Sequence, residues 1–307
     1  MLTLLATVDY PMRFATTPFP LPPRPEEAFA LAGVPPRTGD LVQAVEAWGR
    51  WVLDEVRPQL AVYYTDAGGH TIIGFFWAKT VRCPNPNCGG EIPLVAQRWL
   101  SKRGSDRRIA YKLHPQPDRT LVVEILRGAA ATADDPGQGT MARGSVQCPF
   151  CPTTVPPEQV KEQFVAGQDG RLLLAVATRQ PKGDGVVFRP ATADDQERFA
   201  TAAAALSRAE AEHDDPFLPL APDEPLPERS SGLRANRYGV TTWGRVFNTR
   251  QTLALAAIAR AIRAAHSELL ARDAVSDEAT AVCLYLALAL SRLSLRLSEA
   301  SLSLIHI

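Results

Sequence analysis

The 307-residue sequence has no excess of charge of either sign, which limits what its overall electrostatic field can do. Lys and Arg together number 33, as do Asp and Glu, so the formal net charge is zero. The chain as a whole therefore does not attract polyanions, and affinity for nucleic acid would have to come from local clusters of basic residues.

The sequence also lacks recognisable targeting segments. Residues 1–8 are uncharged and run directly into Asp9-Tyr10-Pro11, unlike a signal peptide, and we judge no apolar run long enough to span a membrane. With 46% hydrophobic residues the chain can still build a substantial core. These features predict a globular cytoplasmic protein, and in that compartment paired cysteines favour metal binding over disulfide formation.

Catalytic motifs are equally scarce. His70, His114, His213 and His266 are scattered, with no acid or nucleophile at a motif spacing. Gly137–Ala142 matches the loose dinucleotide-binding pattern G-x-G-x-x-A, but no predicted strand immediately precedes it and no predicted helix follows. The residues alone therefore indicate a binding module.

Cysteine is scarce too, but four of the five cysteines form two close pairs. The segment CPNPNCGG contains Cys83 and Cys88, and the segment CPFC contains Cys148 and Cys151. Two tight turns that each present two thiolates, brought together by strand pairing, complete a closed tetrahedral zinc site. We predict that these four residues bind one Zn(II), with two disulfides or four unrelated core thiols as the alternatives.

Two features depart from the usual zinc-binding turn. The first pair has four intervening residues in place of two, and Pro152 stands where the second turn would favour glycine. The fifth cysteine, Cys283, lies inside an apolar helical run and is predicted to be a buried small hydrophobe.

Hydrophobic periodicity predicts an α+β fold, in which a zinc-ribbon β insert is followed by helical segments. Strands are expected at residues 71–81, 107–113, 120–126, 144–147, 171–178 and 186–189. Helices are expected at residues 40–56, ending before Pro58, at 157–164, at 192–212 with Thr192 as N-cap, after Asn248, and at 277–297. The order of strand, turn, hairpin, strand and turn is that of a zinc ribbon with a long central hairpin.

These elements predict five regions. They are a proline-rich connector and amphipathic helix (1–70), a zinc-ribbon-containing β domain (71–190), a helix and acidic linker (191–228), a basic elbow with two helices (229–300), and a tail that we interpret as artificial (301–307). Residues 194–228 carry ten acids and two bases, whereas residues 229–263 carry seven arginines and no acid.

Two groups of residues are candidates for contact with DNA. The first contains six bases within fifteen positions, opposed only by Asp106: Arg98, Lys102, Arg103, Arg107, Arg108 and Lys112. We interpret it as a phosphate track, with a solvated hairpin face as the alternative. The second group is Arg237, Tyr238, Trp243, Arg245 and Arg250. Nucleic-acid contact with aromatic stacking and a packed elbow are both open for it, and the packed elbow is preferred.

In combination, several segments resemble a family of bacterial and archaeal adenine-specific DNA methylases that contain a zinc ribbon. They are Phe76–Val81, Cys83–Val95, Gly144–Cys151, and Tyr238–Gly244 with Phe247 and Arg250-Gln251, and the resemblance extends to about Arg292. In such proteins a glycine-rich loop for S-adenosylmethionine lies upstream of this region and an Asp-Pro-Pro-Tyr motif lies downstream. The present chain contains neither.

The resemblance implies that the chain is the central part of such an enzyme, inserted in a Rossmann-like α/β methyltransferase. It would bind zinc, contact double-stranded DNA and pack against the remainder of the methyltransferase. S-adenosylmethionine and the flipped adenine would be held by parts outside this chain, which alone is expected to be inactive. The alternative is a stand-alone zinc-ribbon adaptor that binds nucleic acid or protein.

Overall fold

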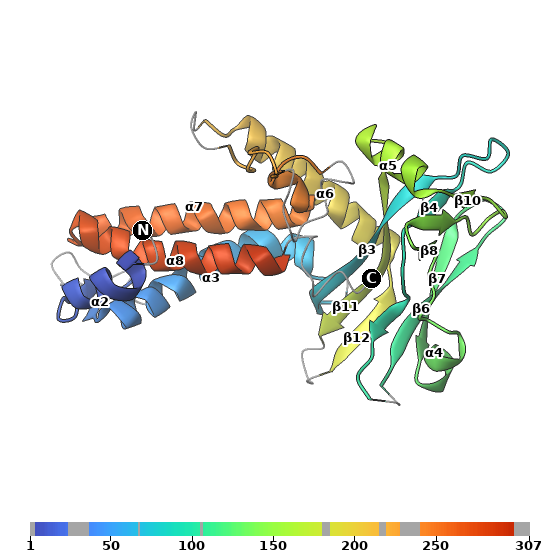
Figure 1. Ribbon diagram of the computed structural model, residues 1–307. Coiled ribbons are helices and arrows are strands. Elements are labelled where there is room, and N and C mark those ends of the chain that lie inside the picture. Colours follow the sequence, from blue (N-terminus) through green and yellow to red (C-terminus); the bar gives the residue numbers. More distant parts are fainter. Residues whose placement is uncertain are drawn as a thin grey trace. The chain divides into compact units, whose positions relative to one another are not determined.

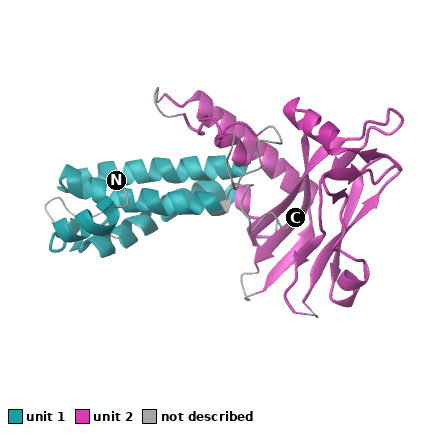
Figure 2. Ribbon diagram, viewed as in Figure 1, with its two compact units in different colours: residues 1–62, 249–298 teal, residues 63–248, 299–307 magenta. Residues whose placement is uncertain are grey.

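The computed structural model describes residues 4–23, 37–66, 68–104, 107–179, 185–214, 219–227 and 240–297. Within them the chain combines helices with small antiparallel sheets, which confirms the predicted mixed α and β composition (Figure 1). It divides into two compact units, Met1–Val62 with Thr249–Ser298 and Tyr63–Asn248 with Glu299–Ile307 (Figure 2). We call them the helical unit and the β unit. Parts of the predicted connector and acidic linker, and the whole of the tail 301–307, lie outside the described residues.

The helical unit is built from three long helices and a short N-terminal segment. The helices are α3 (Leu41–Tyr64), α7 (Thr249–Ala271) and α8 (Ser276–Leu297). The segment contains the π-helix η1 (Leu5–Asp9), α2 (Tyr10–Arg13), and β1 (Phe19–Pro20) paired with β2 (Thr38–Gly39). Apolar side chains from all of these helices form one core, in which Trp48 is fully buried and donates its indole N–H to the carbonyl of Pro20 at 2.9 Å.

The predicted end of α3 was wrong. A proline inside a helix removes a backbone hydrogen bond and costs about 3 kcal/mol, yet α3 continues past Pro58 to Tyr64. Val52 and Val56 before the proline and Leu60 after it all pack into the core of the helical unit. Burial of an apolar stripe on both sides of Pro58 therefore offsets the missing hydrogen bond.

Helix α8 is more apolar than the sequence pattern had suggested. Ser276–Leu295 is long and apolar enough to cross a membrane by length and composition, so the prediction that no apolar run reaches that length was wrong for this helix. The same composition is found in core helices. Ala281, Val282 and Leu286 of α8 are buried in the core of the helical unit, but only 22% of the apolar window is buried. Cys283 is only partly buried against that core.

The β unit contains three antiparallel sheets within its described residues. The largest has the order β12 (Val186–Pro190), β11 (Gly170–Arg179), β3 (Thr71–Arg82) and β4 (Glu91–Pro93). The second has the order β5 (Trp99–Ser101), β6 (Ile109–Pro115) and β7 (Leu121–Arg127), and the third β10 (Thr154–Val155), β9 (Ser145–Gln147) and β8 (Met141–Ala142). Helical segments are α4 (Ala129–Ala133), α5 (Pro157–Val165), α6 (Ala193–Ala211) and η4 (Gly244–Val246). The six strands predicted from the sequence are confirmed, with small shifts at their ends.

The four-stranded sheet is buried on both faces. On one face, Ala78 of β3 and Leu174 of β11 share a core with Tyr111 of β6. On the other face, Trp77 of β3 packs against Phe199 of α6, with ring centroids 4.7 Å apart. Successive residues of a strand point to opposite faces, so β3 is apolar along most of its length because both of its faces are covered.

The chain passes very close to itself where it returns from α4 towards the second cysteine pair. The backbone N–H of Met141 donates to the carbonyl of Val95 at 2.9 Å, and the N–H of Val95 donates to Thr140 Oγ1 at 3.1 Å. A Cβ added to Gly139 would lie 2.0 Å from the carbonyl oxygen of Val95. Close backbone approach therefore requires glycine here, which explains this glycine without a dinucleotide.

We expect Gly139→Ala to destabilise the β unit by about 1–3 kcal/mol or more, because the added methyl group collides with backbone that cannot move independently. Gly137→Ala is the matched control, since its Cβ would meet only Asp135 Oδ1 at 3.5 Å. Urea unfolding followed by tryptophan fluorescence compares the two variants. Equal midpoints would show that the crossing at Val95 is not tight.

Candidate metal centre

The first cysteine turn begins where β3 ends. The N–H of Cys83 donates to the carbonyl of Gly90 at 2.9 Å, and the N–H groups of Cys88 and Gly89 both donate to the carbonyl of Asn85 at 2.9 and 3.0 Å. The Asn85 side chain accepts a further hydrogen bond from the N–H of Asn87 at 3.0 Å. Gly89 adopts a φ of +60°, which favours glycine. The longer spacing between Cys83 and Cys88 is thus absorbed by a local turn centred on Asn85.

The second turn begins where β9 ends. The N–H of Cys148 donates to the carbonyl of Thr153 at 3.0 Å, and β10 then pairs antiparallel with β9, with Thr154 opposite Gln147. The turn is therefore closed by Thr153, and Pro152 is exposed where glycine had been expected.

The two turns bring all four predicted sulfur atoms together. Sγ of Cys83 lies 3.7 Å from that of Cys151, Sγ of Cys88 lies 3.7 Å from that of Cys148, and all four atoms lie within 4.8 Å of one another. A disulfide would require about 2.05 Å. Four sulfurs placed about 2.3 Å from a tetrahedral ion lie about 3.8 Å apart. The four thiols can therefore hold one metal ion, and the disulfide and scattered-thiol alternatives do not fit.

A small apolar cluster supports the two turns. The cysteines pack with Val81, Ile92, Val146, Val155, Val160 and Phe164 from β3, β4, β9, β10 and α5. The ring of Phe150 from the second turn lies directly on Gly90 of the first, where an added Cβ would be 2.5 Å from a ring carbon. A cluster of this size provides little burial by itself, so a metal ion would add much of the local stability.

The surroundings of the thiols favour different protonation states. Burial raises the pKa of Cys148 to about 12 and also raises that of Cys83. Hydrogen bonds from Thr153 lower the pKa of Cys151 to about 6. Backbone and amide donors point at the sulfurs as well, from Phe150 N to Cys148 at 3.4 Å and from Asn85 Nδ2 to Cys151 at 3.9 Å. A metal cation that displaces the thiol protons would compensate the negative charge of the thiolates, including those whose burial makes ionisation unfavourable.

Two side chains attach the centre to neighbouring elements. Gln163 of α5 exchanges two hydrogen bonds with the backbone of Arg82, at 2.8 and 2.9 Å, and so fixes the end of β3. Arg119, in the turn between β6 and β7, donates to the carbonyl of Asn87. The β6–β7 hairpin is therefore fastened at its tip to the first cysteine turn.

The six bases of the predicted phosphate track do not share one environment. Arg98 is only 16% exposed at its side chain and pairs with Asp134, while donating to the carbonyls of Asp134, Asp135 and Gln138. Lys112 also pairs with Asp134, at 2.6 Å. Arg98 thus serves to fix the loop after α4, and one carboxylate neutralises part of the charge of both residues.

The other four bases cluster in the β5–β6 turn. Lys102, Arg103 and Arg107 are exposed, and Arg108 is half-buried with its guanidinium 6.0 Å from the ring of Trp99. Within the described residues, none of these four forms an ion pair with a carboxylate. The structure therefore separates four available bases from two that are internally engaged.

The second predicted DNA-contacting group is only partly described. Arg237 and Tyr238 lie outside the described residues. Trp243 is 39% exposed and Arg245 is exposed, whereas Arg250, in the first turn of α7, is only 2% exposed. Backbone hydrogen bonds from Trp243 to Glu224 and from Gly244 to Pro222 pack this segment against the preceding extended stretch. These contacts favour the packed-elbow interpretation for the described part.

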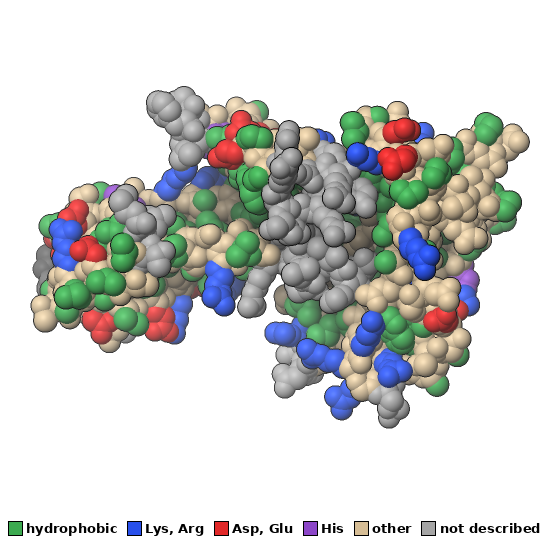
Figure 3. Space-filling model, viewed as in Figure 1, with side chains coloured by type: hydrophobic (Ala, Val, Ile, Leu, Met, Phe, Trp, Pro, Cys, Tyr) green, Lys and Arg blue, Asp and Glu red, His purple; other side chains and the backbone are tan. Residues whose placement is uncertain are grey.

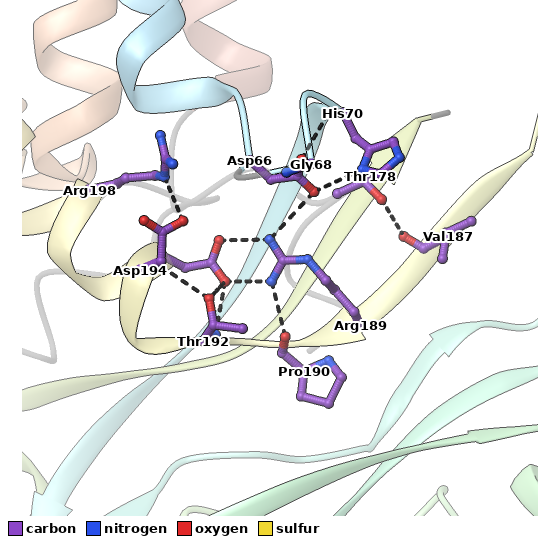
Figure 4. Close-up of polar contacts among 11 residues, drawn as sticks. Asp66, Gly68, His70, Thr178, Val187, Arg189, Pro190, Thr192, Asp194 and Arg198 are labelled. Atoms are coloured by element: carbon purple, nitrogen blue, oxygen red, sulfur yellow. Dashed lines mark hydrogen bonds and ion pairs between the residues drawn. The ribbon is translucent and has the colours of Figure 1, made fainter. Parts of the chain in front are cut away.

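Sequence reasoning missed a buried ion network in the β unit (Figure 4). Arg189 of β12 bonds both carboxylate oxygens of Asp195, at 2.5 and 2.9 Å, and lies 3.9 Å from Asp66, which also pairs with His70 at 3.2 Å. Asp195 is 0% exposed and forms a capping box with Thr192 at the start of α6. The N-cap at Thr192 was visible in the sequence, but the pairing of Asp195 with Arg189, six residues earlier, was not.

The network sets the ionisation of its carboxyl groups. Burial alone would raise the pKa of Asp195, but hydrogen bonds from Arg189 and Thr192 outweigh it and hold the pKa below its usual value. The pKa of Asp66 is lowered in the same way against the effect of burial, with His70 as the main hydrogen-bond donor. Both groups are therefore ionised at neutral pH and join β12, α6 and the start of β3.

Comparisons with known proteins identify no relative of this chain. A scan of the chain against protein-family models found no match, and searches of curated proteins and of solved structures found none either.

We expect Arg189→Met to cost about 3–5 kcal/mol at neutral pH, because it leaves the Asp195 carboxylate buried without its partner. The lowered pKa of Asp195 means that the ion pair stabilises the fold above about pH 4 and that this stability disappears as the pH falls through the folded pKa. The deficit of the variant should therefore shrink on acidification. Urea unfolding between neutral pH and about pH 3 measures it, with exposed Arg208→Met as control. A deficit that is constant with pH would contradict this role.

Proposed function

We propose that the chain is the zinc-binding, DNA-contacting central part of a DNA adenine methyltransferase and is not catalytic by itself. The observation that supports the zinc assignment is that four cysteine sulfur atoms lie within 4.8 Å of one another, with two of the distances at 3.7 Å. A site with four thiolates and no open position suits structural Zn(II), which contributes binding energy to folding and supplies no reactive ligand.

The arrangement of the chain supports the insertion part of this proposal. In chain order the β unit interrupts the helical unit, whose residues come from both ends, Met1–Val62 and Thr249–Ser298. Three of the segments that carry the family resemblance also lie around the metal centre, whereas the fourth, Tyr238–Gly244 with Phe247 and Arg250-Gln251, is only partly within the described residues. Phe76–Val81 lies in β3, Cys83–Val95 contains the first turn and β4, and Gly144–Cys151 contains β9 and the start of the second turn.

The proposed division of labour follows from these residues. The zinc centre would fix the ends of β3 and β9 and the tip of the β6–β7 hairpin, and the β5–β6 turn would present its bases to duplex DNA. Binding of S-adenosylmethionine and of a flipped adenine would belong to the remainder of the methyltransferase. A stand-alone adaptor with the same zinc centre is the second candidate, favoured by the apolar clusters that the β unit forms from its own residues.

We expect the purified chain to contain one zinc ion. Cys83→Ser and Cys148→Ser should each abolish stoichiometric zinc and lower the unfolding midpoint, because each removes one of four thiolate ligands. Cys283→Ser is the control, since its sulfur lies in the helical unit and donates weakly to Ile262 at 3.6 Å. Elemental analysis measures the zinc content of each variant. Absence of zinc, or an equal decrease in Cys283→Ser, would remove the zinc ribbon from the proposal.

We expect replacement of Lys102, Arg103, Arg107 and Arg108 together by Ala to weaken binding to any duplex similarly. The slope of log affinity against log salt should flatten by about 0.9 for each phosphate that the protein no longer neutralises, with sequence preference retained. Fluorescence anisotropy over a salt series measures both quantities, after zinc content and circular dichroism have shown that the variant is folded. Full affinity with an unchanged slope would favour the stand-alone adaptor instead.

A further inference from the structure

The bases of the β5–β6 turn belong to a larger surface that the linear sequence does not show. Register pairing places Ile109 opposite Arg127, the last residue of β7, and the N–H of Gly128 donates to the carbonyl of Arg108 at 2.9 Å. Arg127, nineteen positions from Arg108 in the sequence, is therefore adjacent to the turn. Its side chain is exposed.

The same surface continues onto the four-stranded sheet. A guanidinium nitrogen of Arg127 donates to the carbonyl of Phe188 in β12 at 2.8 Å. Two residues earlier in β12, Val186 pairs with Arg179, the exposed last residue of β11. Two residues of a strand span about 7 Å, so Arg179 lies on the strand next to β12, two positions along from the point where Arg127 reaches β12. Figure 3 shows Lys and Arg side chains gathered at this end of the β unit.

We call this set the basic rim. It consists of Lys102, Arg103, Arg107, Arg108, Arg127 and Arg179. Five of the six side chains belong to exposed residues, and within the described part of the chain none of the six forms an ion pair with a carboxylate. The nearby Asp134 is already engaged by Arg98 and Lys112. Asp106 of the β5–β6 turn lies outside the described residues, so by sequence the six rim bases face one acid in this turn, on a chain of zero net charge.

We propose that the basic rim, including Arg127 and Arg179, binds the phosphate backbone of duplex DNA. Five of the six residues are arginines, whose planar guanidinium presents several donors to phosphate oxygens. Arg127 uses one nitrogen for Phe188 and keeps others for a ligand. Charges spread over three chain segments fit an extended polyanion better than a single phosphate group.

A nucleic acid fits this surface better than an anionic membrane. Membrane-surface segments combine basic residues with apolar side chains that enter the lipid. The described part of the β5–β6 turn offers only Ser101, Lys102, Arg103, Gly104, Arg107 and Arg108. The turn therefore offers side chains that can follow phosphates and no apolar anchor for lipid. Beside Arg179 the exposed apolar residues are Val186 (41%) and Val187 (36%), which are short and belong to a paired strand, so they cannot insert deeply into lipid.

The rim is also held at a fixed place relative to the metal centre. The β6–β7 hairpin links the two, because Arg127 of the rim ends β7 and Arg119, in the turn at the other end of the hairpin, bonds the first cysteine turn. This inference rests on the proposed DNA-contacting function, and it adds residues from β7 and β11 that no sequence pattern placed there.

The test is a pair of matched double variants of the zinc-loaded full chain. Arg127→Gln with Arg179→Gln removes two rim charges, and Lys161→Gln with Arg208→Gln removes two exposed charges on α5 and α6. Binding of a duplex of random sequence is followed over a salt series. We expect the rim variant to bind about tenfold or more weakly at low salt, with the salt slope reduced by about 1.8 because two phosphates are no longer neutralised. The control should match the wild type.

The outcomes separate the rim from the proposed function. Equal weakening of DNA binding in both double variants would mean that only net charge matters, and would contradict a specific role of the basic rim. If the rim double variant binds DNA like the wild type while the β5–β6 turn variant binds more weakly, the role of Arg127 and Arg179 is contradicted and the proposed DNA contact by the turn is retained. If neither the rim variant nor the β5–β6 turn variant changes DNA binding, both the basic rim and the proposed DNA contact are contradicted. Equally strong, rim-dependent binding to vesicles containing phosphatidylserine would overturn the assignment to nucleic acid.

Discussion

The convergence of two cysteine turns is the constraint on which the β unit depends. Fifty-nine residues separate Cys88 from Cys148, yet each short sulfur–sulfur distance joins one cysteine from each turn. The strands that deliver the turns, the contact of Phe150 with Gly90 and the close crossing at Gly139 all place these sulfurs. A bound metal ion would crosslink the two cysteine turns, which otherwise share only a small apolar cluster.

Local patterns in the sequence were sufficient to predict much of this fold. The paired cysteines, the apolar strands and the N-cap at Thr192 are each recognisable within a few residues, and the structure places them as expected. The continuation of α3 through Pro58 was missed because the local cost of proline is visible in sequence, whereas the compensating burial depends on the other helices. Local rules fail where tertiary packing outweighs them.

Ion pairs formed by the tertiary fold could not be predicted either. An aspartate on a surface and one that is buried against arginine have the same sequence signature, so neither Asp195 with Arg189 nor Asp134 with Arg98 could be foreseen. These pairs change the functional interpretation. They withdraw Arg98 and Lys112 from a run of bases that looks uniform in sequence, while strand register adds Arg127 and Arg179 from distant positions. A cluster of charges along the chain therefore does not define a charged surface until strand pairing and ion pairs are known.

The central claim is that one Zn(II) ion is bound by four thiolates from the two turns. Zinc X-ray absorption spectroscopy of the purified chain tests it most directly, because it reports the identity and distance of the ligand atoms. The account predicts a single shell of four sulfurs at about 2.3 Å. A shell that contains nitrogen or oxygen, or fewer than four sulfurs, would contradict it.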